Sequence, residues 1–116
     1  MRLLIIGTLG GQIGAASQIA IQRGATVQQA DTIDIALQIM RAGQSADLIM
    51  ADVNLQIDDL VKSLDRERMT VPVIACGVGN DTKAAVRAIR AGAKEYLPLP
   101  PDAELIAAVL EAVAEE

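Results

Sequence analysis

The feature that most limits the fold of this chain is a short apolar run, Leu48–Ala51, which ends on an acidic residue, Asp52. An apolar run of this length, bounded by polar residues, is typical of a strand that is buried on both faces of a parallel sheet. In such sheets, ligands and reacting groups lie just beyond the carboxyl ends of the strands. We therefore expect any functional site of this chain to include Asp52.

Further apolar runs alternate with segments whose apolar residues recur at helical spacing. This alternation favours a parallel sheet with helices on both sides, and right-handed crossovers leave few topologies. We expect one domain, residues 1–116, with a flavodoxin-like (βα)5 fold, a three-layer sandwich with sheet order 2-1-3-4-5. The switch point between the first and third strands should then bring Gly7, Thr8 and Asp52 together. The expected strands are 3–6, 26–29, 48–51 with Asp52 at its end, 72–76 and 95–97.

Each expected helix has a polar N-cap candidate or an apolar stripe that predicts which side faces inward. The N-cap candidates are Asp31 or Thr32, Asn80 or Asp81, and Asp102. The residues predicted to face inward are Ile13, Ala16 and Ala20 in the first helix, Ile33, Ala36, Leu37 and Met40 in the second, Leu60, Val61 and Leu64 in the third (57–68), Ala85, Val86 and Ile89 in the fourth, and Leu105, Ile106, Val109, Leu110 and Val113 in the last.

Composition argues against several functional classes. A single cysteine, Cys76, and the absence of histidine make a transition-metal site and an internal disulfide unexpected, and they fit a reducing cytoplasm. No apolar run is long enough for a membrane helix or a signal peptide. The net charge of −5 argues against nucleic-acid binding by this segment, because phosphate contacts need clustered Lys and Arg. We expect no cofactor and no metal.

A glycine-rich segment, Gly7–Gly14, is the first candidate site. It reads GTLGGQIG, follows a strand and opens a helix, as a dinucleotide-binding fingerprint does, and Asp31 lies near the end of the second strand where a ribose would be held. The spacing is GxxGGxxG instead of GxGxxG, and the chain is short for two mononucleotide-binding halves. A small nucleotide-binding protein is therefore an alternative, and a flexible turn is the simpler interpretation.

The second candidate is a phosphoacceptor site. The segments DLIMADVN and GAKEYLPLP resemble the receiver domains of response regulators, and the resemblance covers the whole chain. The resemblance implies a carboxylate that accepts a phosphoryl group, an acid pair that holds Mg²⁺, a Ser or Thr that follows the phosphate, a Lys that pairs with it and an aromatic residue that reports the change. By position, Asp52 matches the phosphoacceptor and Tyr96 the switch aromatic.

The remaining family positions depart from the pattern. Gly7 and Thr8 stand at the acid pair, Gly77 at the hydroxyl residue and Leu99 at the lysine. Phosphoryl transfer depends on positioning and charge stabilisation, and Mg²⁺ needs oxygen ligands in octahedral geometry. We therefore expect Asp52 to be a vestigial phosphoacceptor, a structural carboxylate that caps the following loop or bonds Thr8. A functional phosphoacceptor at Asp52 is the alternative.

Three longer segments, RLLIIGTLGGQIGAA, VIACGVGND and RAGAKEYLPLPPDAELIAAV, are similar to the receiver domains of flagellar sigma-54-dependent transcription activators. The resemblance implies a regulatory module and not an enzyme, controlled by contact with a small flagellar-assembly checkpoint protein of the FliX type. No Walker A motif or basic recognition helix occurs in these residues, so we expect the ATPase and DNA-binding modules of such activators to be absent from this chain.

Two surfaces are candidates for protein contact. Ile35 and Ile39 lie opposite the inward stripe of the second helix, where adjacent apolar residues indicate a contact patch or ordinary scattered surface apolarity. Lys83, Arg87 and Arg90 lie on the fourth helix, on a solvated face or on the face that receivers use for dimerisation. A homodimer through the fourth helix, fifth strand and fifth helix would need self-complementary contacts.

Overall fold

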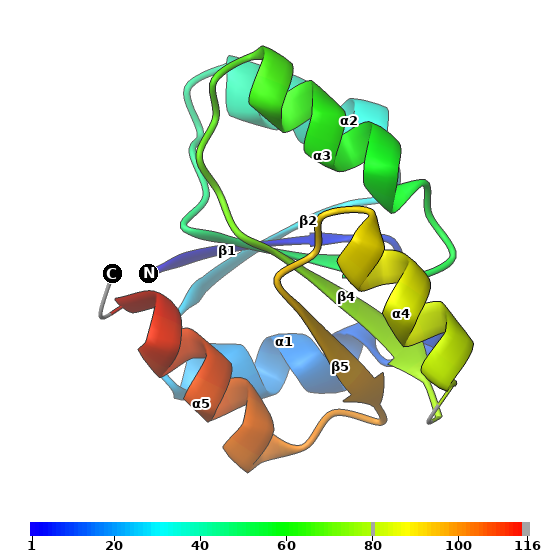
Figure 1. The fold of residues 1–116 in the computed structure, drawn as a ribbon. Coiled ribbons are helices and arrows are strands. Elements are labelled where there is room, and N and C mark those ends of the chain that lie inside the picture. The colour runs from blue at the N-terminus through cyan, green and yellow to red at the C-terminus, as the bar shows by residue number, and fades with distance from the viewer. Residues whose placement is uncertain (80, 115–116) are drawn as a thin grey trace.

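A computed structural model describes residues 1–79 and 81–114, and of residues 113 and 114 only the backbone. The expected α/β topology is confirmed: five parallel strands form one sheet in the order β2-β1-β3-β4-β5. Figure 1 shows this twisted sheet between two layers of helices. The strands are β1 (Arg2–Ile6), β2 (Thr26–Ala30), β3 (Leu48–Asp52), β4 (Val73–Val78) and β5 (Glu95–Leu99).

The helices divide between the two faces of the sheet. One face packs against α1 and α5, and the other packs against α2, α3 and α4 (Figure 1). No helix in the described ranges is long and apolar enough to span a membrane. The helices are α1 (Ile13–Gln22), α2 (Ile33–Arg41), α3 (Ile57–Arg66), α4 (Thr82–Arg90) and α5 (Ala103–Ala114), with a short 3-10 turn, η1 (Leu9–Gly11), before α1.

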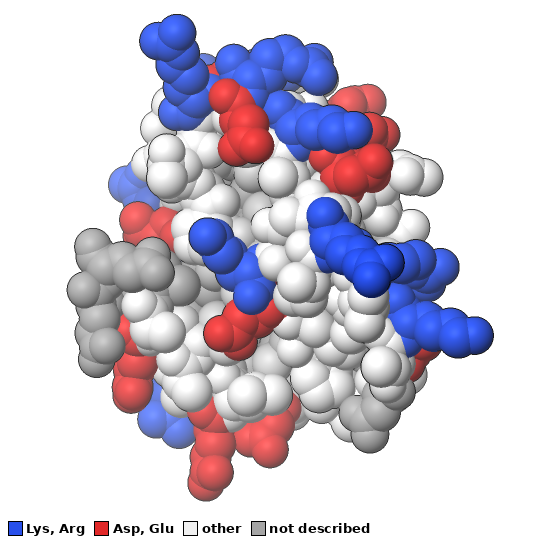
Figure 2. Space-filling view, viewed as in Figure 1, with Lys and Arg blue, Asp and Glu red and all other residues white. Residues whose placement is uncertain are grey.

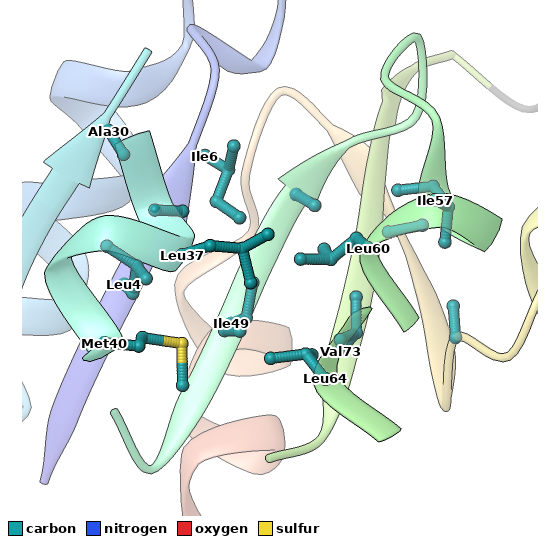
Figure 3. Packing of buried hydrophobic residues seen from close by; sticks show 14 of the residues in the cluster. Leu4, Ile6, Ala30, Leu37, Met40, Ile49, Ile57, Leu60, Leu64 and Val73 are labelled. Carbon is teal, nitrogen blue, oxygen red and sulfur yellow. The ribbon is translucent and has the colours of Figure 1, made fainter. Parts of the chain in front are cut away.

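The sheet separates two apolar clusters because successive strand residues point to opposite faces. In β1, Leu4 and Ile6 join the cluster under α2 and α3, while Leu3 and Ile5 join the cluster under α1 and α5. Figure 3 shows the first cluster, with Leu37 of α2 and Leu60 of α3 over Ile49 of β3. Every buried residue in the described part of the chain is apolar. Charge and polarity therefore lie at the sheet's edges and on the helix surfaces.

Helix starts follow the predicted capping chemistry. Thr32, and not Asp31, caps α2, because its Oγ1 accepts a hydrogen bond from the Ile35 amide at 3.2 Å. Asp81 caps α4 by accepting from the Ala84 amide at 3.1 Å. Asp102 accepts from the Glu104 and Leu105 amides at 2.8 and 3.3 Å. The alternative cap Asn80 lies outside the described residues.

The predicted inward face of α4 was wrong. Ala84 and Ala88 are 5% and 3% exposed, whereas Val86 and Ile89 are 42% and 46% exposed. The physical reason is the close approach of α4 to its neighbours: a Cβ placed on Gly92, just after the helix, would lie 2.7 Å from a methyl carbon of Val61 on α3. Only small side chains fit beneath α4, so its larger apolar residues face solvent.

Smaller corrections concern α5 and α2. Leu105 was predicted to face inward but is 38% exposed, while Ile106 and Leu110 are buried. Ile39 is half-buried and packs against the core, so it does not share an outer patch with Ile35, which is 42% exposed. Val113 lies outside the residues whose side chains are described. The remaining predicted inward residues are buried or half-buried.

The orientation of α4 gives a stability test. We expect Ala88→Leu to destabilise the domain by about 1–3 kcal/mol, because Ala88 is 3% exposed and belongs to the apolar cluster under α2 and α3, so a longer side chain must displace packed neighbours. We expect Ile89→Ala to change the free energy of unfolding by no more than about 0.5 kcal/mol, because Ile89 faces solvent. Urea unfolding followed by circular dichroism measures both variants. A loss of about 2–5 kcal/mol in Ile89→Ala would instead place Ile89 in the core.

Candidate functional site

The candidate site lies where β1, β3 and β4 end at the same edge of the sheet. β1 pairs with β3 through Ile6 and Ala51, so the next residues, Gly7 and Asp52, are neighbours. A Cβ placed on Gly7 would lie 3.0 Å from the Asp52 Cβ and 3.7 Å from its Oδ2. Gly7 also has a φ of +88°, which L side chains rarely adopt. The backbone at Gly7 is therefore built for a residue without a side chain.

Asp52 has a structural role in the turn that follows β3. Its Oδ1 accepts a hydrogen bond from the Asn54 amide at 2.9 Å, an Asx-type turn. Within the described residues no hydrogen bond joins Asp52 to Thr8, whose side chain is exposed. The carboxylate is half-buried, so one oxygen is committed to the turn while the group keeps access to solvent.

The residues at this edge do not fit Mg²⁺, the ion that the resemblance to receiver domains implies. Magnesium prefers an octahedron of oxygen ligands, anchored by carboxylates. Gly7 and Thr8 supply no carboxylate beside Asp52, and in the described part of the chain no three His, Cys, Asp or Glu residues form a metal-binding group. Asp52 alone is a poor anchor for the ion.

Tyr96 fills the space that a hydroxyl-bearing residue at position 77 would occupy. A Cβ placed on Gly77 would collide with the Tyr96 hydroxyl oxygen and would lie 2.8 Å from Cγ1 of Val53. The Tyr96 hydroxyl is buried and has no hydrogen-bond partner among the described residues. From the sequence, Gly77 was predicted only as a position without a hydroxyl. The sequence feature that could have indicated this contact is Tyr96, the chain's one aromatic residue, on the strand that pairs with β4.

Leu99, which stands at the lysine position, is 3% exposed and belongs to the cluster under α1 and α5. Its side chain is part of the core and offers no charge to Asp52. The cation that does border the Asp52 cavity is Arg87 of α4, which lines a space of about 170 Å³ together with Asp52, Asp81 and Tyr96. From the sequence, Arg87 was predicted only on an interaction surface, because its position beside the Asp52 cavity depends on where α4 lies.

Cys76, the free thiol on β4, is not a nucleophile in this fold. Its side chain is fully buried, and burial, with a smaller effect from the negative charge of Asp52, raises the pKa of the Cys76 thiol to about 12. The thiol therefore stays protonated at neutral pH, and thiolate chemistry requires the deprotonated form.

The glycine-rich segment Gly7–Gly14 does not present a phosphate cradle. The amides of Gly11 and Ile13 donate to the Thr8 carbonyl at 3.0 and 3.1 Å, and the Gln12 amide donates to the Leu9 carbonyl at 3.1 Å. Leu9 is fully buried in the core. A phosphate-binding loop needs outward amides that are not already bonded, so this segment serves as a compact turn.

The candidate interaction residues lie on two separate helices. Lys83, Arg87 and Arg90 are exposed on α4, and Ile35 is exposed on α2. The hollows between α2 and α3 and between α3 and α4 show that α3 lies between these two helices. The structure therefore keeps the cations of α4 together but does not bring Ile35 beside them.

The buried hydroxyl of the half-buried Tyr96 predicts an unusual titration. Burial, followed by the negative charge of Asp81, raises the pKa of Tyr96 above its ordinary value of about 10. Because the pKa of Tyr96 is higher in the folded than in the unfolded chain, its contribution to the free energy of unfolding is complete below the ordinary pKa. This contribution is lost as the pH rises through the folded-state pKa. Phenolate absorbance measures the midpoint directly in a chain without tryptophan.

The matched variants are Gly77→Ala and Gly14→Ala. Gly77→Ala should displace the Tyr96 ring and bring the titration midpoint back toward about 10, because the new Cβ needs the space of the hydroxyl. Gly14→Ala adds a methyl group where nothing lies within 4 Å and should leave the midpoint unchanged. Equal midpoints in all three proteins would show that Tyr96 does not occupy the space over Gly77.

Comparisons with known proteins agree with this fold. The response regulator receiver domain family matches residues 11–111. The transcriptional regulatory protein FlbD of Caulobacter vibrioides is 53% identical over 116 residues, which are 100% of this chain and 26% of that protein. Two solved structures share the fold at 20% identity. A two-component response regulator from Clostridium difficile has a TM-score of 0.83, and the match covers 100% of this chain and 97% of that chain. The receiver domain of NtrX from Brucella abortus has a TM-score of 0.81, and the match covers 97% of this chain and 98% of that chain. The chain spans about a quarter of the length of the FlbD protein, and the family match over most of its length shows that it belongs to the response regulator receiver domain family.

Proposed function

We propose that this receiver domain is controlled by contact with another protein and not by phosphorylation of Asp52. We further propose that it regulates a flagellar sigma-54-dependent transcription activator, with a flagellar-assembly regulatory protein of the FliX type as its partner. The 53% identity with the transcriptional regulatory protein FlbD supports the assignment to a regulator of this type. The missing phosphorylation chemistry supports the mode of control.

The observation that carries the proposal is the packing of Tyr96 over Gly77. In a phosphorylated receiver, a hydroxyl at this position and a mobile aromatic residue would respond to the phosphate. Here the aromatic hydroxyl already occupies the space over Gly77. A phosphoryl group on Asp52 would also find no lysine at Leu99 and no second carboxylate for Mg²⁺. Each loss of about 1.4 kcal/mol in transition-state stabilisation slows a reaction about tenfold, so a loss of several kcal/mol would slow phosphoryl transfer by a factor on the order of thousands.

The alternative, a working phosphoacceptor, is favoured by two observations. Asp52 stands at the end of β3 and is half-buried, and only its Oδ1 accepts a hydrogen bond among the described residues. Arg87 lines the same cavity and offers one positive charge to a phosphate. These two groups alone provide less charge stabilisation than the full receiver set, so we rank this function second.

A second part of the proposal is a homodimer through α4, β5 and α5. Val86 and Ile89 on α4 and Leu105 on α5 are exposed apolar side chains, between 38% and 46% accessible. Exposed apolar residues in neighbouring elements are candidates for burial in an interface. Because the same face would meet itself across a two-fold axis, these residues would pack against their own copies.

Phosphorylation can be tested by mass. We expect the domain incubated with acetyl phosphate and Mg²⁺ to gain no phosphoryl group, because the ion and the developing charge lack ligands. Asp52→Ala is the matched variant, and a receiver that keeps its acid pair and lysine serves as the positive control. A phosphoryl adduct on the wild type that disappears in Asp52→Ala would establish the alternative function.

The homodimer can be tested with two isoleucines of similar exposure. We expect Ile89→Glu to lower the average mass in sedimentation equilibrium, because a buried carboxylate would oppose association. Ile35→Glu, at 42% exposure on α2, is the matched control and should leave the mass unchanged. A monomeric wild type at all concentrations, or equal effects of the two substitutions, would contradict a dimer through α4.

A further inference from the structure

A groove of about 630 Å³ runs between the connection from β3 to α3 and the side of α4. Its lining is mixed: the half-buried Val53 and Leu55 and the buried Ala88 lie beside the polar side chains of Asn54 and Gln56. Arg87 and Arg90 line it on the α4 side, and Asp58 lies on its opposite side at the start of α3. The groove thus combines apolar contacts with two cations on the α4 side.

Among the described residues, the two arginines of this groove have no salt-bridge partner. The salt bridge between Arg41 and Glu67, with an N–O distance of 2.6 Å, is the one ion pair among the described residues. Arg87 and Arg90 are both exposed and lie more than 4.0 Å from any described carboxylate. Their charges are therefore available to a ligand that enters the groove.

The groove also lies in the positive part of an acidic chain. Residues 53–94, which contain every residue that lines the groove, hold seven Lys or Arg and five Asp or Glu, a formal charge of +2, although the whole chain carries −5. Figure 2 shows most of the basic side chains of this view over α3 and α4, with a group of acidic side chains among them and others toward α5. The asymmetry favours an acidic ligand on this side of the molecule.

We propose that this groove docks an acidic, amphipathic helix of a partner protein. The inference rests on the contact control proposed above and names the surface that carries it. Arg87 and Arg90 are three residues apart on α4, a rise of about 4.5 Å. Carboxylates one turn apart on the incoming helix would meet both arginines, and apolar residues of the same helix face would cover Val53 and Leu55.

Docking there would reach the Asp52 pocket without any phosphoryl group. Arg87 and Val53 line both the groove and the cavity that holds Asp52 and Tyr96. A ligand carboxylate that binds Arg87 in the groove changes the charge that faces Asp52. A ligand that displaces Val53 would also affect the Tyr96 ring, because both side chains lie over Gly77. The groove thus couples protein contact to the residues that phosphorylation would otherwise move.

Two other occupants fit less well. Nucleic acid is disfavoured because no aromatic side chain lines the groove for base stacking and the chain is acidic overall. A second copy of this chain is disfavoured because the described acids of α5, Glu104 and Glu111, are seven residues apart, about 10.5 Å along the helix. That spacing does not match the single turn between Arg87 and Arg90.

The test uses a synthetic helix-forming peptide of about 15 residues, with an apolar stripe and two glutamates one turn apart, and a second peptide with lysines in their place. We expect the acidic peptide to shift amide resonances of the groove, and the lysine peptide to bind at least about tenfold more weakly because its charges face the arginines. Shifts confined to α1, α2 or α5, or equal binding of both peptides, would overturn the proposal.

Paired variants locate the effect. Arg87→Gln with Arg90→Gln removes the two cations on the α4 side of the groove and should weaken the acidic peptide about tenfold. Lys62→Gln with Arg66→Gln removes the same charge from exposed positions of α3 outside the groove and should change binding by less than about twofold. Circular dichroism verifies that both variants are folded. Equal losses in the two variants would show a general field effect and would contradict a docking groove.

Two parallel measurements separate this inference from the proposed function. If the wild type binds the peptide in the groove but also gains a phosphoryl group from acetyl phosphate, the proposed mode of control fails and the groove stands. If no phosphoryl group is gained and the Arg87 and Arg90 variant binds the peptide normally, the groove fails alone. Binding of a single-stranded oligonucleotide to the groove in place of the peptide would overturn the protein occupant.

Discussion

The close packing of backbone and side chains at the carboxyl edge of the sheet is the constraint on which this site depends. Gly7 and Gly77 end up where any added Cβ would press on Asp52 or on Tyr96. Each contact lies between elements that are far apart in the sequence and are held by the parallel pairing of β1, β3, β4 and β5. The sheet therefore fixes a compact pocket in which positions 7 and 77 have little space for a side chain.

Much of the fold could be predicted because it depends on local patterns. The apolar runs became strands, Thr32, Asp81 and Asp102 became caps, and the alternation of elements led to the correct sheet order. The orientation of α4 could not be predicted in this way. The spacing of Val86 and Ile89 fits an inward stripe, but the narrow space beneath the helix selects Ala84 and Ala88, and that space is a property of the tertiary structure.

The sequence predicted which residues lie at the Asp52 site but not which of them are in contact. Position alone identified Asp52, Gly7, Thr8, Gly77 and Leu99, since these follow strand ends or family spacing. That the Tyr96 hydroxyl lies over Gly77, and that Leu99 is part of the core, required the packing of β5 against β4 and α5. The approach of Arg87 to the Asp52 cavity likewise depends on where α4 lies. Sequence patterns name residues at an edge of the sheet, but only packing decides which of them touch.

Each departure from the receiver pattern is fitted to its own surroundings. An aspartate at position 7 would require a backbone at a φ of +88° to accept a Cβ 3.0 Å from that of Asp52. A threonine at position 77 would require Tyr96 to leave its space, and a lysine at position 99 would bring a charge into the apolar cluster under α1 and α5. These obstacles involve different neighbours, so removing one of them leaves the other two in place. Restoring the receiver pattern in this chain therefore requires changes in the packing around all three positions and not a single substitution.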